Sequence, residues 1–166
     1  MAYFSASGMT AKLAKTLSNA LDADLYEIKP AKAYTPEDLN WQNPHSRSSV
    51  EMADKTGRPA VSGKFENMED YDTVFVGFPI WWYVAPTVIN TFLEQYDFSN
   101  KTVVPFATSG GSGMGETNKY LRGSCKGAVL KEGKVFSPNA TPDELSSWAK
   151  SMGIYNISSK RLEELP

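Results

Sequence analysis

The sequence contains very little cysteine and histidine, the residues that build most metal sites and many nucleophilic ones. Among 166 residues there is one cysteine, Cys125, and one histidine, His45. A single cysteine excludes an internal disulfide and a cysteine-clustered metal site, so we interpret Cys125 as a buried bystander thiol. One histidine in a polar stretch disfavours a His-based triad and a multi-histidine metal site. We therefore predict no metal site and assign no catalytic residue.

Long runs of one charge and long apolar runs are also absent. No run of Lys and Arg exceeds two residues, and the formal net charge is −2, so we expect no basic patch for nucleic acid. No apolar stretch approaches the ~18 residues of a transmembrane helix. The first residues do not show the charged and then apolar segments of a signal peptide. These absences predict a cytoplasmic protein without nucleic-acid or membrane partners.

What the chain does have is enough apolar material for one core. It is 41% hydrophobic and 22% charged, at a length typical of one domain. Short apolar runs, Gly/Ser/Pro loops and amphipathic helices follow one another in order, which is typical of βαβ units and a parallel sheet. We expect strands near 2–4, 24–28, 73–78, 102–107 and 129–136, and helices near 11–21, 50–55, 86–96, before 122, and from 141 to 153.

This order of elements predicts a three-layer, doubly wound α/β fold with a five-stranded parallel sheet. We expect one domain over residues 1–153 and a tail over residues 154–166. Two strand orders are common in such folds, and in either one ligands bind at the carboxyl ends of the strands. Residues 30–68 form a long connection of a kind that is often functional, and they contain Trp41 and Arg47.

The first chemistry-bearing loop is Ser5-Ala6-Ser7-Gly8-Met9-Thr10, between a strand and a helix. Unpaired N–H groups at a helix N-terminus favour an anion, and the hydroxyls and glycine suit a phosphate bound without a charged side chain. The loop lacks a Walker lysine and the dinucleotide pattern G-x-G-x-x-G. A helix cap made of serines is an equally good interpretation of this loop alone.

Two further loops follow predicted strands. Pro79-Ile80-Trp81-Trp82-Tyr83 offers rings that can stack on a planar ligand, although a tryptophan pair covering the core would look the same. Residues 108–115 hold four glycines, which let the backbone approach a ligand closely, the alternative being a mobile linker. Each loop alone is a weak signal, whereas all three in order after successive strands are specific.

Together the loops resemble the cofactor-binding blocks of flavodoxins, in particular the short bacterial ones. The first loop is similar to their hydroxyl-x-hydroxyl-Gly-x-Thr phosphate loop. Residues 77–82, followed by Ala85-Pro86 and residues 89–94, are similar to the second block, and residues 105–113 to the third. The resemblance covers residues 2–153 and implies a flavodoxin-like fold with strand order 2-1-3-4-5.

The resemblance also implies FMN as the cofactor. The implied sites are the phosphate on Ser5, Ser7, Gly8, Met9 and Thr10, the border of the isoalloxazine on Pro79, Ile80, Trp81 and Trp82, and its pyrimidine side on Ser109, Gly110 and Gly111.

Two departures from the family pattern bear on function. The first strand is shorter than in flavodoxins, and the third loop has no aromatic residue. Two uses of the flavin therefore stay open: electron transfer between a redox partner protein and another, or an NAD(P)H-dependent reductase of quinones or similar small acceptors. An interaction module without FMN is a third hypothesis, against which the intact phosphate loop argues.

Overall fold

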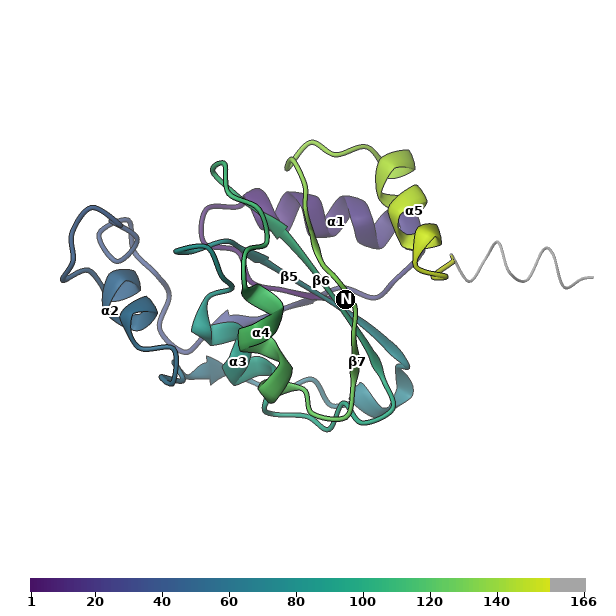
Figure 1. Cartoon of the computed structure of the whole chain (residues 1–166), viewed down its shortest axis with the longest axis horizontal. Coiled ribbons are helices and arrows are strands. Elements are labelled where there is room, and N and C mark those ends of the chain that lie inside the picture. The colour runs from purple at the N-terminus through teal and green to yellow at the C-terminus, as the bar shows by residue number, and fades with distance from the viewer. Residues whose placement is uncertain (156–166) are drawn as a thin grey trace, which may run out of the picture.

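A parallel sheet lies at the centre of the molecule, with strand order β2-β1-β5-β6-β7. The computed structural model describes residues 1–155, so residues 156–166 of the predicted tail lie outside the described residues. The strands are β1 (Ala2–Tyr3), β2 (Tyr26–Glu27), β5 (Thr73–Pro79), β6 (Thr102–Thr108), β7 (Val129–Leu130) and β8 (Lys134–Val135), the last also paired with β6. The predicted fold class is confirmed (Figure 1). The predicted strand order 2-1-3-4-5 is also confirmed, because β5, β6 and β7 are the third, fourth and fifth strands of this sheet along the chain.

The predicted fifth strand is interrupted, and Pro105 on the neighbouring strand explains the interruption. β7 pairs with the start of β6, and β8 pairs with its end at Phe106 and Ala107. Between them the ladder would need an N–H from Pro105, which proline lacks. Gly133 passes close by, since a Cβ on it would lie 2.8 Å from the carbonyl oxygen of Pro105.

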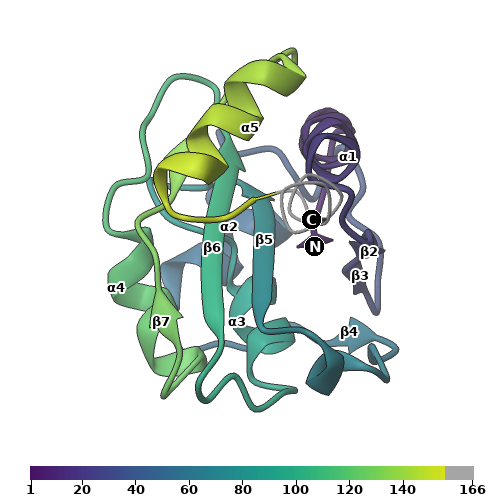
Figure 2. The same cartoon turned by 90° about the vertical axis from the view of Figure 1, so that its right-hand side faces the viewer.

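Helices cover both faces of the sheet and form two separate cores (Figure 2). α1 (Met9–Leu21) and α5 (Pro142–Ser151) pack on one face, and α3 (Thr87–Leu93) and α4 (Thr117–Leu121) pack on the other. Alternation along β5 feeds both cores, because Val74 and Val76 face α3 while Phe75 faces α1. Thr141 caps α5, since its hydroxyl accepts from the Glu144 N–H. Short 3₁₀ turns lie at η1 (Met68–Asp70) and η2 (Arg122–Ser124).

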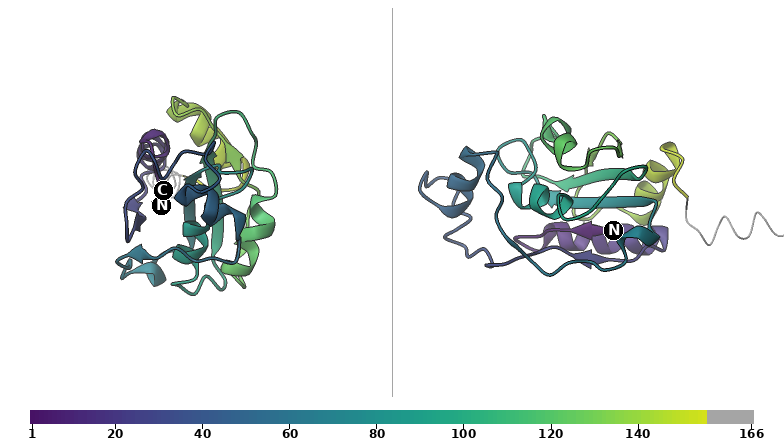
Figure 3. Two further views of the ribbon diagram at one scale, coloured as in Figure 1. Left: turned by 90° about the vertical axis from the view of Figure 1, so that its left-hand side faces the viewer. Right: turned by 90° about the horizontal axis from the view of Figure 1, so that it is seen from below.

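The long connection forms a lobe beside the carboxyl edge of the sheet (Figure 3). It contains α2 (Arg47–Ala53) and a small antiparallel ladder of β3 (Lys29–Pro30) with β4 (Val61–Ser62). The helix begins earlier than predicted because Ser46 caps it by accepting from the Ser49 N–H. The ladder was not predicted, since its two strands are two residues each and separated by 30 residues.

The first strand is central and short, as expected from the sequence. β1 pairs in parallel with Tyr26 and Glu27 on one side and with Val76 and Gly77 on the other. The Phe4 N–H extends the ladder by donating to the Gly77 carbonyl at 2.9 Å. The first loop therefore leaves the sheet directly beside the end of β5.

Three further sequence interpretations concern isolated features. Cys125 is buried, its thiol donates to the Leu121 carbonyl, and burial raises the pKa of that thiol. Within residues 1–155 no helix is long and apolar enough to cross a membrane. In the same part of the chain no group of His, Cys, Asp and Glu side chains could hold a metal ion.

Candidate functional site

The three loops singled out in the sequence meet at one edge of the sheet. They follow β1, β5 and β6, which are neighbours and parallel, so their carboxyl ends lie together. In Figure 1 this edge faces the lobe that holds α2. The edge is where doubly wound folds bind their ligands.

The first loop presents unpaired backbone N–H groups. Ser5 Oγ accepts from the N–H groups of Gly8 and Ala11, each at 3.1 Å, which folds the loop back on itself. Gly8, the N-cap of α1, has a φ of 90°, a conformation that favours glycine. Among the described residues the N–H groups of Ser7, Met9 and Thr10 have no hydrogen-bond partner. They lie at the positive end of a 13-residue helix and suit an anion.

Thr10 sits in the first turn of α1, and its side chain is buried. It is 2% exposed, and its Oγ1 lies 2.8 Å from Oγ1 of Thr108 at the end of β6. The first loop therefore combines a serine cap with N–H groups that have no partner among the described residues. Ser5 supplies the cap, while other backbone N–H groups stay available.

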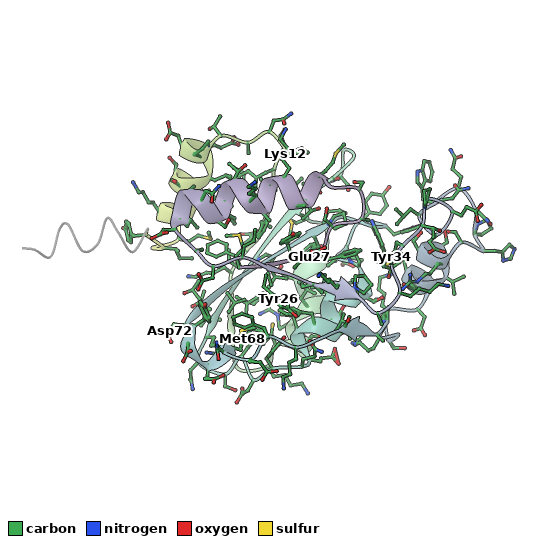
Figure 4. All side chains as sticks on the ribbon, turned by 180° about the vertical axis from the view of Figure 1, so that it is seen from behind. Lys12, Tyr26, Glu27, Tyr34, Met68 and Asp72 are labelled. Carbon is green, nitrogen blue, oxygen red and sulfur yellow. The ribbon has the colours of Figure 1, made fainter. Side chains whose placement is uncertain are left out.

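No cation lies in the first loop, and the nearest lysine is directed elsewhere. Lys12 donates its ammonium to Asn139 Oδ1 in the connection before α5. Figure 4 shows Lys12 on the side of α1 that faces away from the sheet. An anion at the loop would therefore be held by N–H groups, hydroxyls and the helix dipole.

The second loop is a tight turn with two strained aromatic residues. Trp81 and Val84 exchange N–H···O bonds of 2.9 and 3.2 Å, and the residues between them, Trp82 and Tyr83, have φ values of 48° and 68°. Such two-residue turns favour Asn-Gly, and a positive φ costs other residues about 1–2 kcal/mol each. Both aromatic residues are exposed. Strain of this kind is typical of functional sites.

Trp81 and Trp82 have opposite surroundings. The Trp81 ring packs edge-on against Phe4 and Tyr34, with centroid separations of 5.6 and 5.3 Å. Trp82, by contrast, is 40% exposed at the sheet edge. Trp81 thus covers the core, and Trp82 has a ring available for a planar ligand.

The third loop is an ordered turn, unlike a mobile linker. Ser109 Oγ accepts from the N–H groups of Gly111 and Ser112 at 3.1 and 2.8 Å, and it is bonded to the Ser112 hydroxyl. The loop also supports the aromatic turn, because a Cβ on Gly115 would lie 2.3 Å from the Tyr83 carbonyl oxygen. Only glycine allows this approach. Among residues 1–155 nothing accepts from the Gly110 N–H.

The long connection packs against Trp81 through Tyr34. The Tyr34 hydroxyl donates to Glu51 at 2.7 Å, and the Arg47 guanidinium lies 3.8 Å from the Tyr34 ring centroid while pairing with Glu51 at 3.1 Å. Burial is the largest cause that raises the pKa of Tyr34, and the hydrogen bond to Glu51 is the next largest. Figure 4 shows Tyr34 between the sheet and the α2 lobe. Arg47 is thus used structurally, while Trp41 is 70% exposed.

The sequence analysis did not select Thr108, although the structure places it where the three loops meet. Its hydroxyl contacts Thr10, its carbonyl accepts from the Ile80 N–H at 2.9 Å, and Ser109 follows it directly. The sequence pattern places this threonine at the start of the third loop, directly after the predicted strand over residues 102–107. Only the fold brings it to a residue 98 positions away.

The sheet is parallel and five-stranded in this order, and a loop with unpaired N–H groups, an exposed tryptophan and a glycine-rich turn lie at its carboxyl edge. This combination defines a flavodoxin-like α/β domain. The sequence profile of the flavodoxin family matches residues 1–152. The chain therefore belongs to the flavodoxin family.

Solved structures show how closely the fold is shared. A protein from Bacteroides eggerthii, provisionally described as a flavoprotein, is 46% identical over 92% of this chain and 96% of its own, with a TM-score of 0.87. A flavoprotein from Lactobacillus acidophilus, determined in complex with FMN, is 22% identical over 89% of this chain and 95% of its own, with a TM-score of 0.66. The second likeness establishes the fold alone.

A curated relative is similar over part of the chain. An uncharacterized NAD(P)H oxidoreductase of Escherichia coli, YcaK, is 29% identical over 75 residues, which are 45% of this chain. The matched segment spans about a third of the length of that relative, 34%.

Proposed function

We propose that this protein binds one FMN non-covalently at the three loops and carries electrons through it. The observation that carries the proposal is the set of unpaired N–H groups of Ser7, Met9 and Thr10, which share one edge with the exposed Trp82. Membership of the flavodoxin family and the FMN complex of the Lactobacillus acidophilus flavoprotein support the same cofactor.

The residues present fit the chemical groups of FMN. The first loop suits a terminal phosphate, because its donors are N–H groups and hydroxyls at a helix N-terminus. Trp82 suits the apolar ring system, and the third loop suits its polar pyrimidine edge. The proposed binding residues are Ser5, Ser7, Gly8, Met9 and Thr10 for the phosphate, Pro79, Ile80, Trp81 and Trp82 along the ring, and Ser109, Gly110 and Gly111 at the pyrimidine.

Bound FMN would supply the redox chemistry, and the protein would bind it, orient it and set its electronic surroundings. Trp82 and the nearby phosphate both disfavour added negative charge on the ring system. The protein is thereby expected to lower the reduction potential of the flavin.

Two uses of the bound flavin remain candidates. In the first the protein passes electrons to a partner protein. In the second it is an NAD(P)H-dependent reductase of quinones or similar small acceptors, which the name of the Escherichia coli relative favours. The exposed ring of Tyr83, next to Trp82, offers a surface for a planar acceptor or a partner protein. Either use would take place in the cytoplasm.

A flavin titration tests the proposal. The purified protein is titrated with FMN, riboflavin and FAD while the quenching of flavin fluorescence is followed. We expect tight FMN binding and much weaker riboflavin binding, because each buried donor left unpaired costs about 1–3 kcal/mol. Equal affinity for FMN and riboflavin, or tighter binding of FAD than of FMN, would contradict a site for a terminal phosphate at the first loop.

Adding NADPH to the FMN-loaded protein without any partner separates the two uses. Loss of the oxidised flavin absorbance, followed by its return when a quinone is added, indicates a reductase. An unchanged spectrum that is bleached only by a reductase protein indicates an electron carrier.

A further inference from the structure

Thr108 is held at a fixed place by the backbone of the sheet. It is the last residue of β6, it is paired with Pro79 across the ladder, and its carbonyl accepts from the Ile80 N–H at 2.9 Å. Its side chain is 5% exposed and lies against the first turn of α1. A substitution that removes only the hydroxyl therefore leaves the position of the residue unchanged.

The number of hydrogens that the Thr10 and Thr108 hydroxyls can donate limits how this pair can bond to a ligand. Each hydroxyl has one hydrogen to donate, and one of the two is used in the 2.8 Å bond between them. Either atom can be that donor in the unliganded protein. If Thr10 donates to a phosphate, Thr108 must be the donor to Thr10, because the single hydrogen of Thr10 is then committed to the anion.

Without Thr108, nothing among the described residues fixes the direction of the Thr10 hydroxyl hydrogen. The bond to Thr108 is the only side-chain hydrogen bond that Thr10 makes in the part of the chain that the structure describes. A donor from Thr108 occupies the Thr10 oxygen and leaves its hydrogen directed outward, and two bonds in series also polarise each other.

We infer that Thr108 is a positioning residue for the phosphate-binding hydroxyl, and that it connects the end of β6 to the first loop through Thr10. This inference rests on the proposed FMN site. In this role Thr108 acts through its hydrogen bond to Thr10 and not through a contact of its own with the ligand.

The test compares FMN with riboflavin in variants of Thr108. The dissociation constant of riboflavin divided by that of FMN measures how much the phosphate contributes to binding. Thr108→Val, which keeps the shape, is expected to lower this ratio about three- to tenfold while riboflavin affinity stays within about twofold. Thr108→Ser, which restores the hydroxyl, is expected to restore the ratio. Thr102→Val, at the other end of β6, is the matched control and is expected to leave the ratio unchanged.

A double variant shows whether Thr108 acts through Thr10. Thr10→Val alone should lower the ratio more than Thr108→Val does, and Thr10→Val/Thr108→Val should be no worse than Thr10→Val. An unchanged or increased ratio in Thr108→Val, or additive losses in the double variant, would overturn the inference while leaving the FMN site intact. A wild-type protein that binds neither flavin would overturn both the FMN site and the role of Thr108.

Discussion

The aromatic turn shows how two neighbouring residues of one type acquire different tasks. Trp81 is fixed between Phe4 and Tyr34, and its backbone pairs with Val84. That pairing places Trp82 in a left-handed conformation with its ring at the sheet edge. The strain in the turn is retained because the surrounding contacts hold it, and the result is an exposed ring on a rigid support.

Substitution of the two tryptophans should therefore separate ligand binding from stability. Trp82→Ala is expected to weaken FMN binding by about 0.5–1.5 kcal/mol for the lost ring stacking, in addition to the effect of the apolar surface that is no longer buried. It is also expected to raise the reduction potential of the flavin. Its melting temperature without FMN should change little. Trp81→Ala is the matched control, expected to lower the melting temperature because it uncovers Phe4 and Tyr34. The reverse pattern would assign the ring site to Trp81.

Gly77 is required by close packing within the sheet. A Cβ on Gly77 would lie 2.3 Å from the ring of Phe106, its partner on β6. Gly77→Ala is expected to destabilise the protein by about 1–3 kcal/mol, measured by urea unfolding, because a dense core cannot accept the methyl group. Gly123→Ala, where nothing lies within 4 Å, is the control and should be close to neutral. Equal stability of both variants would contradict this account of Gly77.

The lobe formed by the long connection is joined to the proposed site through Tyr34. Tyr34 links it to Trp81, and Arg47 and Glu51 of α2 hold the Tyr34 ring and hydroxyl. The lobe therefore has a pH-dependent attachment. Burial and the Glu51 carboxylate raise the pKa of Tyr34, so the folded protein keeps its proton where an unfolded chain loses it.

The consequence is a loss of stability in alkali. Above pH ~10, the ordinary tyrosine pKa, the unfolded chain binds fewer protons than the folded one, so the free energy of unfolding falls as pH rises. Tyr34→Phe is expected to be less stable at pH 8, because it loses the bond to Glu51, and to lose less further stability on going to pH 11. Urea unfolding at both pH values measures this. If the free energy of unfolding falls equally with pH in the variant and the wild type, Tyr34 does not cause the loss of stability.

The elements differ in how far their sequence could predict them. β5 and β6 carry continuous apolar runs, and α5 carries a threonine cap followed by proline, so local residues decide their structure. The β3–β4 ladder and the break opposite Pro105 depend on pairing partners far along the chain. Local patterns hold no information on such pairings.

The site shows the same division. The loops could be located from their residues, because glycines, hydroxyls and tryptophans follow strand ends. The serine cap of the first loop could also be anticipated, because it joins residues six positions apart. The pairing of Thr10 with Thr108 and the different burial of the two tryptophans could not, because each depends on contacts between distant parts of the chain. The predicted roles of the individual site residues stay predictions.

At the scale of the whole molecule, the proposed site draws on three strands from distant parts of the chain. The loops begin after residues 4, 79 and 108, and only the assembled sheet brings them together. A ligand that bridges them binds the folded state and not the unfolded one, so it stabilises the protein by mass action.

The most direct test of the account is a map of the backbone amide resonances by NMR, recorded with FMN and with riboflavin. We expect the N–H resonances of Ser7, Met9 and Thr10 to move strongly with FMN and little with riboflavin, because only FMN carries the phosphate that they bind. The Trp82 indole and the Gly110 N–H should respond to both ligands. If FMN leaves the resonances of Ser7, Met9 and Thr10 in place, or moves them no more than riboflavin does, the phosphate does not bind at the first loop and the central claim is wrong.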